Sequence, residues 1–185
     1  RIRENGTQNI IIGDQKFRDI KVAHADANFF QVFSLPLLHG QASTVLTEPN
    51  KVVLSKSIAE KFFGTDDAVG RTLQVEGGEE LYLITGVMEN IPENTHFHFD
   101  LFLAIAGLPE AAEDTWMNSN FFTYLVLAKG HDYKQLEAKL PQTIEKYLGP
   151  QMQSAMGLSL AEFRKQGNDL GLFLQPLTDI HLSTE

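Results

Sequence analysis

Hydrophobic and polar residues alternate along several stretches of the chain in the way that is typical of β-strands. The run Phe17–Ala25 predicts a strand, and "RTLQVEGGEELYLITGVM" predicts two more, joined at Gly77–Gly78 by a hairpin turn. In "NTHFHFDLFLAI", every second residue from Phe97 to Leu103 is apolar, so these side chains would share one face of a further strand. Other strands are expected over residues 52–54, 121–130 and 170–177.

Apolar residues that recur every three or four positions predict helices between these strands. A short helix is expected after Asp26, which would serve as its N-cap, and Pro36 would end it. Another helix is expected to begin after Ser55 and to end at Gly64, because glycine readily adopts the left-handed conformation of a helix C-cap.

The last third of the chain is expected to be mainly helical. Apolar spacing predicts a helix over residues 132–149, which Pro141 would kink or split. A polar linker containing Met152 and Met156 would then lead to a short helix at 158–167. Because helices and strands intermix and the middle portion is locally antiparallel, the expected fold class is α+β.

Composition is that of a folded domain and narrows the function classes. The chain has 185 residues, of which 43% are hydrophobic, enough for one domain or two small ones. Its 15 basic and 24 acidic residues give a formal charge of −9, which argues against a nucleic-acid surface. The absence of cysteine excludes disulfides, thiol nucleophiles and thiolate metal sites.

Neither end of the chain carries a recognisable targeting segment, and no apolar run is long enough to span a membrane. Runs such as Tyr124–Ala128 are far shorter than the ~20 residues that a membrane-spanning helix needs. The chain opens with "RIRENG" rather than with an initiator Met, so we interpret it as a segment of a longer protein.

Histidine and carboxylate side chains form the one pattern with metal-binding spacing. His96, His98 and Asp100 would lie on one face of the predicted strand, and His24 and Asp26 are two residues apart near another. If those strands were neighbours, the five residues could form a metal site. The alternative, which we favour, is an ordinary strand whose polar face meets solvent or another subunit, because there is no helical HExxH pair.

Other candidate motifs point to structure rather than to catalysis. "GTDDAVGRT", residues 64–72, looks like a phosphate-binding loop, but it has an extra residue between its glycines and Arg71 in the place of lysine. We predict a helix end followed by a turn. Trp116, in a polar loop, would either cover the core or anchor an interface. We therefore predict no catalytic, cofactor-binding or metal-binding residues.

The order of three longer segments resembles a known family. "VAHADANFFQVFSLPLLHGQAS", "VVLSKSIAEKFFGTDDAVGRTLQV" and "ITGVMENIPENTHFHFD", with "LQPLTDIHL" near the end, resemble the extracytoplasmic core domain of MacB/FtsX-type ABC transporter permeases. The resemblance runs from about Phe17 to Leu182. It implies a porter-like subdomain with βαβ character, formed by residues 1–45 and 118–185, and an inserted, sabre-like mixed α/β subdomain over 46–117.

The same resemblance implies a function without catalysis in this domain. Such domains lie on the periplasmic face of the inner membrane, between transmembrane helices of a permease subunit, and relay movement powered by a separate cytoplasmic ATPase. The implied partners are those membrane helices, a second permease subunit or domain, the ATPase, and an outer periplasmic partner or lipoprotein. No cofactor is implied in this domain. The resemblance identifies no transported substrate.

Two other functions stay open at this point. One is an extracytoplasmic sensor that binds a small ligand between the two subdomains, which a signalling region after Glu185 would distinguish. The other is a metal-dependent enzyme that uses the His and Asp rows described above.

Overall fold

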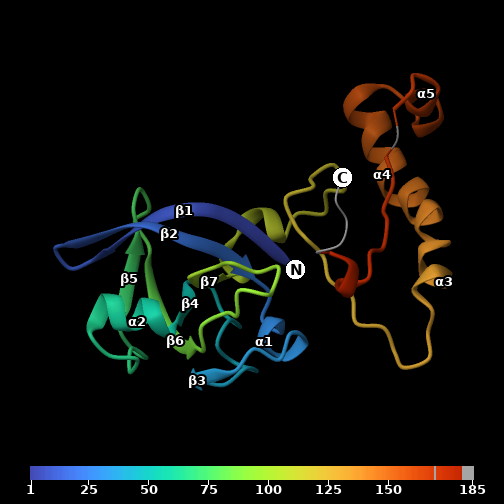
Figure 1. Ribbon diagram of the computed structural model, residues 1–185. Coiled ribbons are helices and arrows are strands. Elements are labelled where there is room, and N and C mark those ends of the chain that lie inside the picture. The colour runs from blue at the N-terminus through green and yellow to red at the C-terminus, as the bar shows by residue number, and fades with distance from the viewer. Residues whose placement is uncertain (169, 181–185) are drawn as a thin grey trace. The chain divides into compact units, whose positions relative to one another are not determined.

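The computed structural model describes residues 1–168 and 170–180 (Figure 1) and shows a mixed α and β protein. The chain forms two compact units. The first contains Arg1–Glu113 and Asn120–Tyr124. The second contains Asp114–Ser119 and the described chain from Leu125 onward. No helix in the described ranges is long and apolar enough to cross a membrane.

All strands of the described chain belong to one sheet in the first unit. Their bounds are β1 (Ile2–Ile12), β2 (Gln15–Ala25), β3 (Leu37–His39), β4 (Lys51–Ser55), β5 (Thr72–Val75), β6 (Leu81–Met88) and β7 (Leu101–Ala104). The strand order is β3-β6-β4-β7-β2-β1-β5, and β5 also pairs with β6. The strands from β6 round to β5 therefore close into a ring, with β3 added beside β6. The β2–β7 and β4–β6 pairs are parallel and the others antiparallel.

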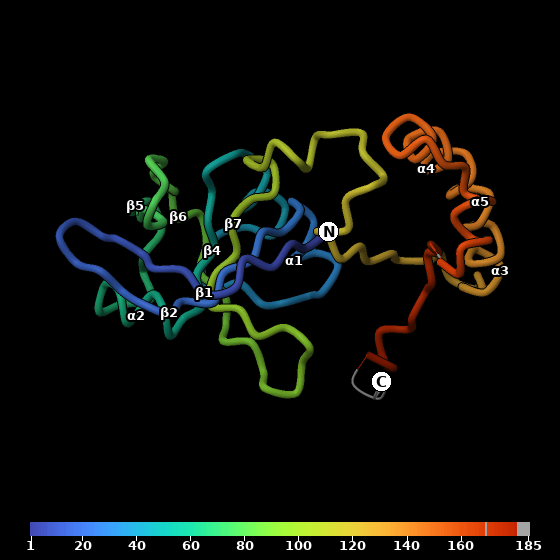
Figure 2. The backbone as a smooth tube through the Cα atoms, turned by 90° about the horizontal axis from the view of Figure 1, so that it is seen from above, coloured from blue at the N-terminus to red at the C-terminus, as the bar shows by residue number. Residues whose placement is uncertain are grey.

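The long β1–β2 hairpin runs past the other strands of the sheet (Figure 2). Its turn is formed by Gly13 and Asp14, and Gly13 has a φ of 56°, which a two-residue hairpin turn of this kind requires. The pairing shifts register twice, between Glu4 and Thr7 and again between Gln8 and Ile10. Our sequence interpretation did not include β1, because the polar run "RENGTQN" hides the strand pattern.

Two apolar clusters lie on opposite faces of the sheet, and the central strands contribute to both. In β4, Val52 and Leu54 belong to the first cluster and Val53 to the second. In β7, Leu101 and Leu103 belong to the first cluster, and Phe102 and Ala104 belong to the second. Because both faces of these strands are covered, their sequences read as continuous apolar runs.

Helix α2 (Lys56–Phe63) packs on the first cluster through Ile58, Ala59 and Phe62. Gly64 ends it with a φ of 73°, so the predicted C-cap is confirmed. Ser55 occupies the predicted N-cap position, but its side chain makes no capping hydrogen bond. The backbone N–H of Ser57 instead donates to Oδ1 of Asn90, at 3.0 Å.

Helix α1 (Phe29–Val32) brings aromatic rings to the second cluster. Phe29 lies 4.5 Å from Phe102 and 5.5 Å from Phe97, between ring centroids. The N-cap residue is Asn28, so the predicted cap at Asp26 is wrong. The Asp26 carboxylate instead accepts hydrogen bonds from the side chain of Arg1.

Three predicted strands are wrong wholly or in part. Within 94–105 only Leu101–Ala104 is a strand, because a turn and bends occupy the residues just after Pro92. In 121–130 only Phe122 pairs, in an isolated antiparallel bridge with Ile2. The described residues of 170–177 form no strand. Apolar composition favoured strands there, but a strand also needs a neighbour to accept its backbone hydrogen bonds.

The second unit is helical, with α3 (Tyr133–Glu137), α4 (Leu140–Met156) and α5 (Leu160–Lys165). The 3-10 turns among the described residues are η1 (Ile105–Gly107) and η2 (Pro109–Ala111) in the first unit and η3 (Leu177–Asp179) in the second. Pro141 lies in the first turn of α4, and the chain breaks between α3 and α4, so the predicted split is confirmed. The predicted linker at Met152 and Met156 is wrong, because both residues belong to α4.

The short helix predicted at 158–167 is confirmed as α5. Ser159 and Glu162 form a reciprocal capping box at its start, in which Ser159 Oγ accepts from the Glu162 N–H at 3.2 Å. The Glu162 carboxylate accepts in return from the Ser159 backbone at 2.8 Å.

The predicted division into subdomains stays a prediction. The expected ranges, 1–45 with 118–185 and 46–117, differ from the two compact units. β2 comes from the first range and pairs in parallel with β7 from the second, so one sheet contains strands of both.

Removal of the Asn90 side chain should weaken the start of α2. We expect Asn90→Ala to lower the free energy of unfolding by about 1 kcal/mol, the usual effect of losing an N-cap acceptor. Ser55→Ala is the matched control and should have the smaller effect, since Ser55 Oγ does not cap the helix. Urea unfolding of both variants measures this, and the reverse order would contradict the assignment.

Gly40 should tolerate no side chain. It has a φ of 93°, and an added Cβ would lie 2.6 Å from the Thr85 carbonyl oxygen and 2.8 Å from Val45 Cγ1. Gly70 has a similar φ of 87° but open space around its Cα. We expect Gly70→Ala to destabilise the protein by about 1 kcal/mol through backbone strain alone. Gly40→Ala should lose about 3 kcal/mol, because overpacking adds to the strain. Equal losses in urea unfolding would contradict the close packing.

Candidate functional site

A cluster of polar side chains surrounds His24, the one histidine of the described chain that is buried, with 5% of its surface exposed. His24 lies on β2 directly opposite Arg3 of β1. Its Nδ1 atom is 3.1 Å from Oδ1 of Asn5, and Arg3 Nη1 donates to the same oxygen at 3.3 Å. The pairing of β1 with β2 shifts register just after Glu4, and such irregularities often re-aim side chains.

Glu110 of η2 completes the cluster from a distant part of the sequence. Its Oε1 atom lies 2.7 Å from Nε of Arg3, and the two side chains are partly buried. Asn120 Nδ2 approaches the other carboxylate oxygen at 3.5 Å. Glu110 therefore balances the charge of Arg3 beside the buried imidazole.

These surroundings keep His24 neutral. Burial, and then the positive charge of Arg3, lower the pKa of His24 from its usual 6.5 to about 4. Because Oδ1 of Asn5 only accepts hydrogen bonds, His24 donates from Nδ1. A neutral imidazole fixed in one tautomer stabilises the β1–β2 pair, and the cluster contains no nucleophilic side chain.

The five residues of the predicted metal site do not come together. Asp26 binds Arg1, and the Asp100 carboxylate accepts the backbone N–H of Lys21 at 2.8 Å. Residues 96 to 98 are not in a strand, so His96 and His98 do not share a strand face as predicted. Across residues 1–168 and 170–180, no group of three or more His, Asp or Glu residues could hold a metal ion.

His96 has an aromatic environment instead. Its Nε2 atom is 3.1 Å from the hydroxyl of Tyr124, and its ring centroid is 3.8 Å from that of Phe97. The ring of Phe33 packs against the ring of Tyr124, with 5.0 Å between their centroids. Burial raises the pKa of the Tyr124 hydroxyl, and the negative charge of Glu4 raises it further. His96 thus helps to hold the segment before β7 against the second apolar cluster, whereas His98 is exposed.

Sequence reasoning missed Arg3, Asn5 and Glu110. The first two are separated by one residue, which was the only local signal that they could act together. Glu110 is more than 100 residues away in sequence, so pattern alone could not pair it with Arg3.

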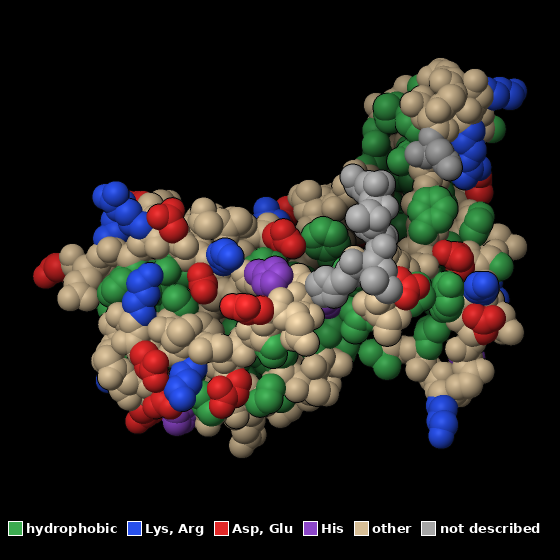
Figure 3. Space-filling view, viewed as in Figure 1, with side chains coloured by type: hydrophobic (Ala, Val, Ile, Leu, Met, Phe, Trp, Pro, Cys, Tyr) green, Lys and Arg blue, Asp and Glu red, His purple; other side chains and the backbone are tan. Residues whose placement is uncertain are grey.

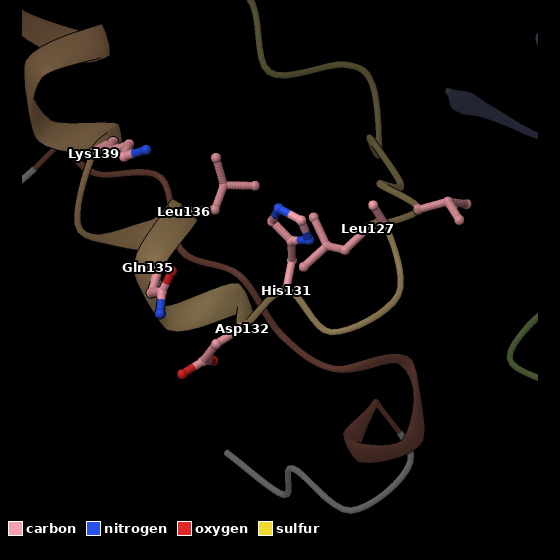
Figure 4. Close-up of a pocket in the computed structure, with 8 residues that line it drawn as sticks. Leu127, His131, Asp132, Gln135, Leu136 and Lys139 are labelled. Carbon is pink, nitrogen blue, oxygen red and sulfur yellow. The ribbon is translucent and has the colours of Figure 1, made fainter.

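The second unit has a partly open hollow of about 220 Å³ between the 126–128 segment and α3 (Figure 4). Val126, Leu127 and Leu136 supply much of its apolar lining. The side chain of His131 points toward Leu127 and Leu136, while the Asp132 carboxylate points away. Asp132 caps α3 by accepting the Lys134 N–H at 2.9 Å. The polar groups therefore do not converge on a common ligand position.

Trp116 packs against the small core of the second unit, which corresponds to the first of its two predicted roles, that of covering the core. Its ring stacks on Tyr147 at 5.0 Å with an angle of 8° between the planes. Its backbone N–H also donates to Gln151 Oε1 of α4, at 2.7 Å. These contacts fix the 114–119 segment on α4.

Comparison with protein families gives one match over most of the chain. The model described as "MacB-like periplasmic core domain" matches residues 3–143. The sequence-based resemblance extended further, to Leu182, which lies outside the described residues. Among curated proteins, no sequence matches the chain.

Solved structures show the same fold at low sequence identity. A domain of a "putative Permease protein" from Porphyromonas gingivalis has a TM-score of 0.69 and 23% identity, over 79% of this chain and 68% of that one. The periplasmic region of MacB from Actinobacillus actinomycetemcomitans has a TM-score of 0.52 and 14% identity, over 92% of this chain and 76% of that one. At these identities the likeness concerns the fold alone.

Acid should destabilise the protein through His24. The folded state holds the pKa of His24 near 4 and the unfolded chain near 6.5, so the unfolded state takes up the proton first as pH falls. Stability should therefore decline between pH 6.5 and 4, by about 3 kcal/mol from this residue. Urea unfolding across this range should show a shallower decline for His24→Gln than for the unmodified protein.

His98→Gln is the matched control, since it makes the same substitution at an exposed histidine outside the His24 cluster. If His24→Gln and the unmodified protein lost stability in parallel, the neutral state of the buried imidazole would be refuted.

Proposed function

Because this chain belongs to the family of MacB-like periplasmic core domains, we propose that it is the periplasmic domain of an ABC transporter permease subunit of the MacB/FtsX type. The observation that carries this proposal is the match over residues 3–143, which includes β2–β7 with α1 and α2. The fold likeness to the periplasmic region of MacB supports it. Within the permease, the domain would bind partners and relay movement.

The domain would need no catalytic residue or cofactor of its own. In this proposal a separate cytoplasmic ATPase hydrolyses ATP. The arrangement of His24, Asp26 and Asp100 is consistent with such a role, because each forms hydrogen bonds within the fold. The metal-dependent enzyme loses its main support, since its five proposed ligands lie in separate environments.

The proposed partners follow from membership of a permease. They are the transmembrane helices of the same subunit, a second permease subunit or domain, the ATPase, and an outer periplasmic protein or lipoprotein. The proposed location is the periplasmic face of the inner membrane. The acidic charge of −9 is consistent with partners other than nucleic acids.

The mixed sheet offers a physical basis for relaying movement. The parallel β2–β7 ladder joins residues 22–25 to 101–104 by backbone hydrogen bonds, and all of these paired residues are buried. A displacement applied to one strand would therefore reach the other without being absorbed by a flexible loop. If porter-like (1–45 with 118–185) and sabre-like (46–117) parts exist as the resemblance implies, this ladder would couple them.

The extracytoplasmic sensor remains the second candidate function, and no contact in the described chain favours it over the permease. The hollow beside α3 lies within the second unit, and its polar groups diverge. A signalling region encoded after Glu185, in place of further membrane helices, would favour the sensor.

ATP-driven movement of the domain tests the proposed function. These 185 residues contain no cysteine, so Lys61→Cys on the exposed face of α2 provides the one spin-labelling site within this domain, with any cysteine elsewhere in the full-length protein replaced by serine. In the full-length permease reconstituted with its ATPase, we expect the distance distribution between labels on two subunits to change when ATP is added. Double electron–electron resonance measures that distribution.

An ATPase variant that binds ATP but does not hydrolyse it should keep the assembly in one state, so that only one of the two label-to-label distance distributions is observed. Unchanged distances in an assembly that hydrolyses ATP would argue against the relay. A full-length protein without membrane helices, or one that never associates with an ATPase, would overturn the permease assignment itself.

A further inference from the structure

Asn5 and Gly6 are the one Asn-Gly pair of the sequence, and they lie at the irregular position of β1 beside His24. Asparagine is a chemically labile residue. It loses its side-chain amide most easily before glycine, because the glycine nitrogen can approach the amide carbon without hindrance from a side chain. The surroundings of this pair therefore decide whether the reaction is suppressed or favoured.

The ladder leaves this pair of residues room to move. The pairing of β1 with β2 stops at Glu4 and resumes at Thr7, so two residues of β1 lie opposite one of β2, as in a β-bulge. Gly6 is exposed, with a φ of 64°, and a Cβ added to it would meet no atom within 4 Å. The backbone rotation that brings the Gly6 nitrogen to the Asn5 side chain therefore need not break a paired rung of the ladder.

Two hydrogen-bond donors polarise the side-chain amide of Asn5. Arg3 Nη1 donates to Oδ1 of Asn5 at 3.3 Å, and His24 Nδ1 lies 3.1 Å from the same oxygen. Because arginine can only donate, the atom that it contacts must be the amide oxygen. Attack on the amide carbon puts negative charge on this oxygen, and donors aimed at the oxygen stabilise that charge. The cluster therefore favours attack at the Cγ atom of Asn5.

A third donor acts on the attacking group. Gln8 Nε2 donates to the backbone carbonyl oxygen of Asn5 at 2.7 Å. This carbonyl belongs to the same resonant peptide unit as the Gly6 N–H, so polarisation of its oxygen makes the N–H more acidic. A more acidic N–H more easily gives the anionic nitrogen that attacks Cγ. Different side chains thus activate the two groups that react.

We propose that Asn5–Gly6 is a self-modifying site, at which the Gly6 nitrogen displaces the side-chain nitrogen of Asn5. The Gly6 nitrogen loses its proton to water and bonds to Asn5 Cγ. The Cγ–Nδ2 bond breaks, and Nδ2 leaves as ammonia with a proton from water. Water then opens the succinimide ring. Opening at Cγ gives an aspartate, and opening at the backbone carbonyl carbon gives an isoaspartate, without any oxidation or reduction.

The modification would place a carboxylate beside His24. The other charged groups of the cluster, Arg3 and Glu110, already balance each other. Two residues further along the same strands, Arg1 and Asp26 form a second balanced pair. The new charge would stay uncompensated until His24 took up a proton, so it would raise the pKa of the imidazole against the lowering that burial causes.

The effect of one added charge should stay local to this cluster. Acidic and basic side chains are interspersed over the visible face of the first unit (Figure 3). No large surface of a single sign is therefore created or removed there. The expected consequence is a change in how His24 responds to pH.

Peptide mapping by mass spectrometry tests the proposal by following the conversion of Asn5 in the folded protein at neutral pH. We expect Arg3→Met to slow this conversion at least about tenfold, because it removes a donor to the developing negative charge. Gln8→Met should slow it severalfold by leaving the Gly6 N–H less acidic. Arg18→Met is the matched control, with the same substitution at an exposed arginine outside the cluster, and should leave the rate unchanged.

The same incubation in urea separates the effect of the fold from that of the local sequence. The unfolded chain keeps the Asn-Gly pair but loses the three donors, so the unmodified protein, Arg3→Met and Gln8→Met should convert at equal rates. The folded, unmodified protein should convert faster than the unfolded one. Slower conversion in the folded state, or equal rates for the folded variants, would overturn the proposal. If Arg3→Met does not fold, Gln8→Met provides the same comparison.

The effect on His24 is measured separately with Asn5→Asp, which introduces the product carboxylate directly. NMR titration of the imidazole should give a pKa above the value of about 4 in the unmodified protein. Asn9→Asp makes the same substitution on β1 beside Glu76 and should leave the pKa of His24 unchanged. An unchanged pKa in Asn5→Asp would overturn the expected link between the modification and His24.

Discussion

The fold of the first unit depends on the burial of β4 and β7 on both faces. A strand that is apolar on both faces must be covered twice, and no single helix can do this. The ring closed by β5 and β6 encloses the first apolar cluster, and α2 covers it further. On the other face, the rings of Phe29, Phe30 and Phe97 pack around Phe102. Removing either covering layer would expose the same two strands.

Local signals in the sequence predicted local structure well. The Phe17–Ala25 strand, the Gly77–Gly78 hairpin, the Gly64 helix end and the break at Pro141 are all present. Strand pairing was not predictable in the same way, because it depends on residues distant in sequence. Ile144, Leu148 and Met152 have helical spacing, so the continuation of α4 through Met152 had a signal that our interpretation overlooked.

The positions of His24, His96 and His98 explain why the spacing of residues in the sequence did not predict the candidate site. His-x-His suggests a metal only if both residues lie on one strand, and the turn after Pro92 prevents this for His96 and His98. His24 is buried through long-range contacts with Arg3 and Asn5, and Arg3 is neutralised by Glu110. The polar groups that matter most to this fold therefore act as structural partners. Family membership, rather than local chemistry, carries the functional conclusion.

The second unit differs from the first, because it buries little apolar surface. Its apolar cluster contains four buried residues, Ile144, Leu148, Met152 and Leu160, with Trp116 and Phe163 packed at the edge. Side chains such as Val126, Leu172 and Phe173 remain exposed. A core of this size contributes little against the conformational entropy of some 60 residues. Its capping box and the stacked Trp116–Tyr147 pair therefore contribute a larger share of the local order here than such contacts do in the first unit.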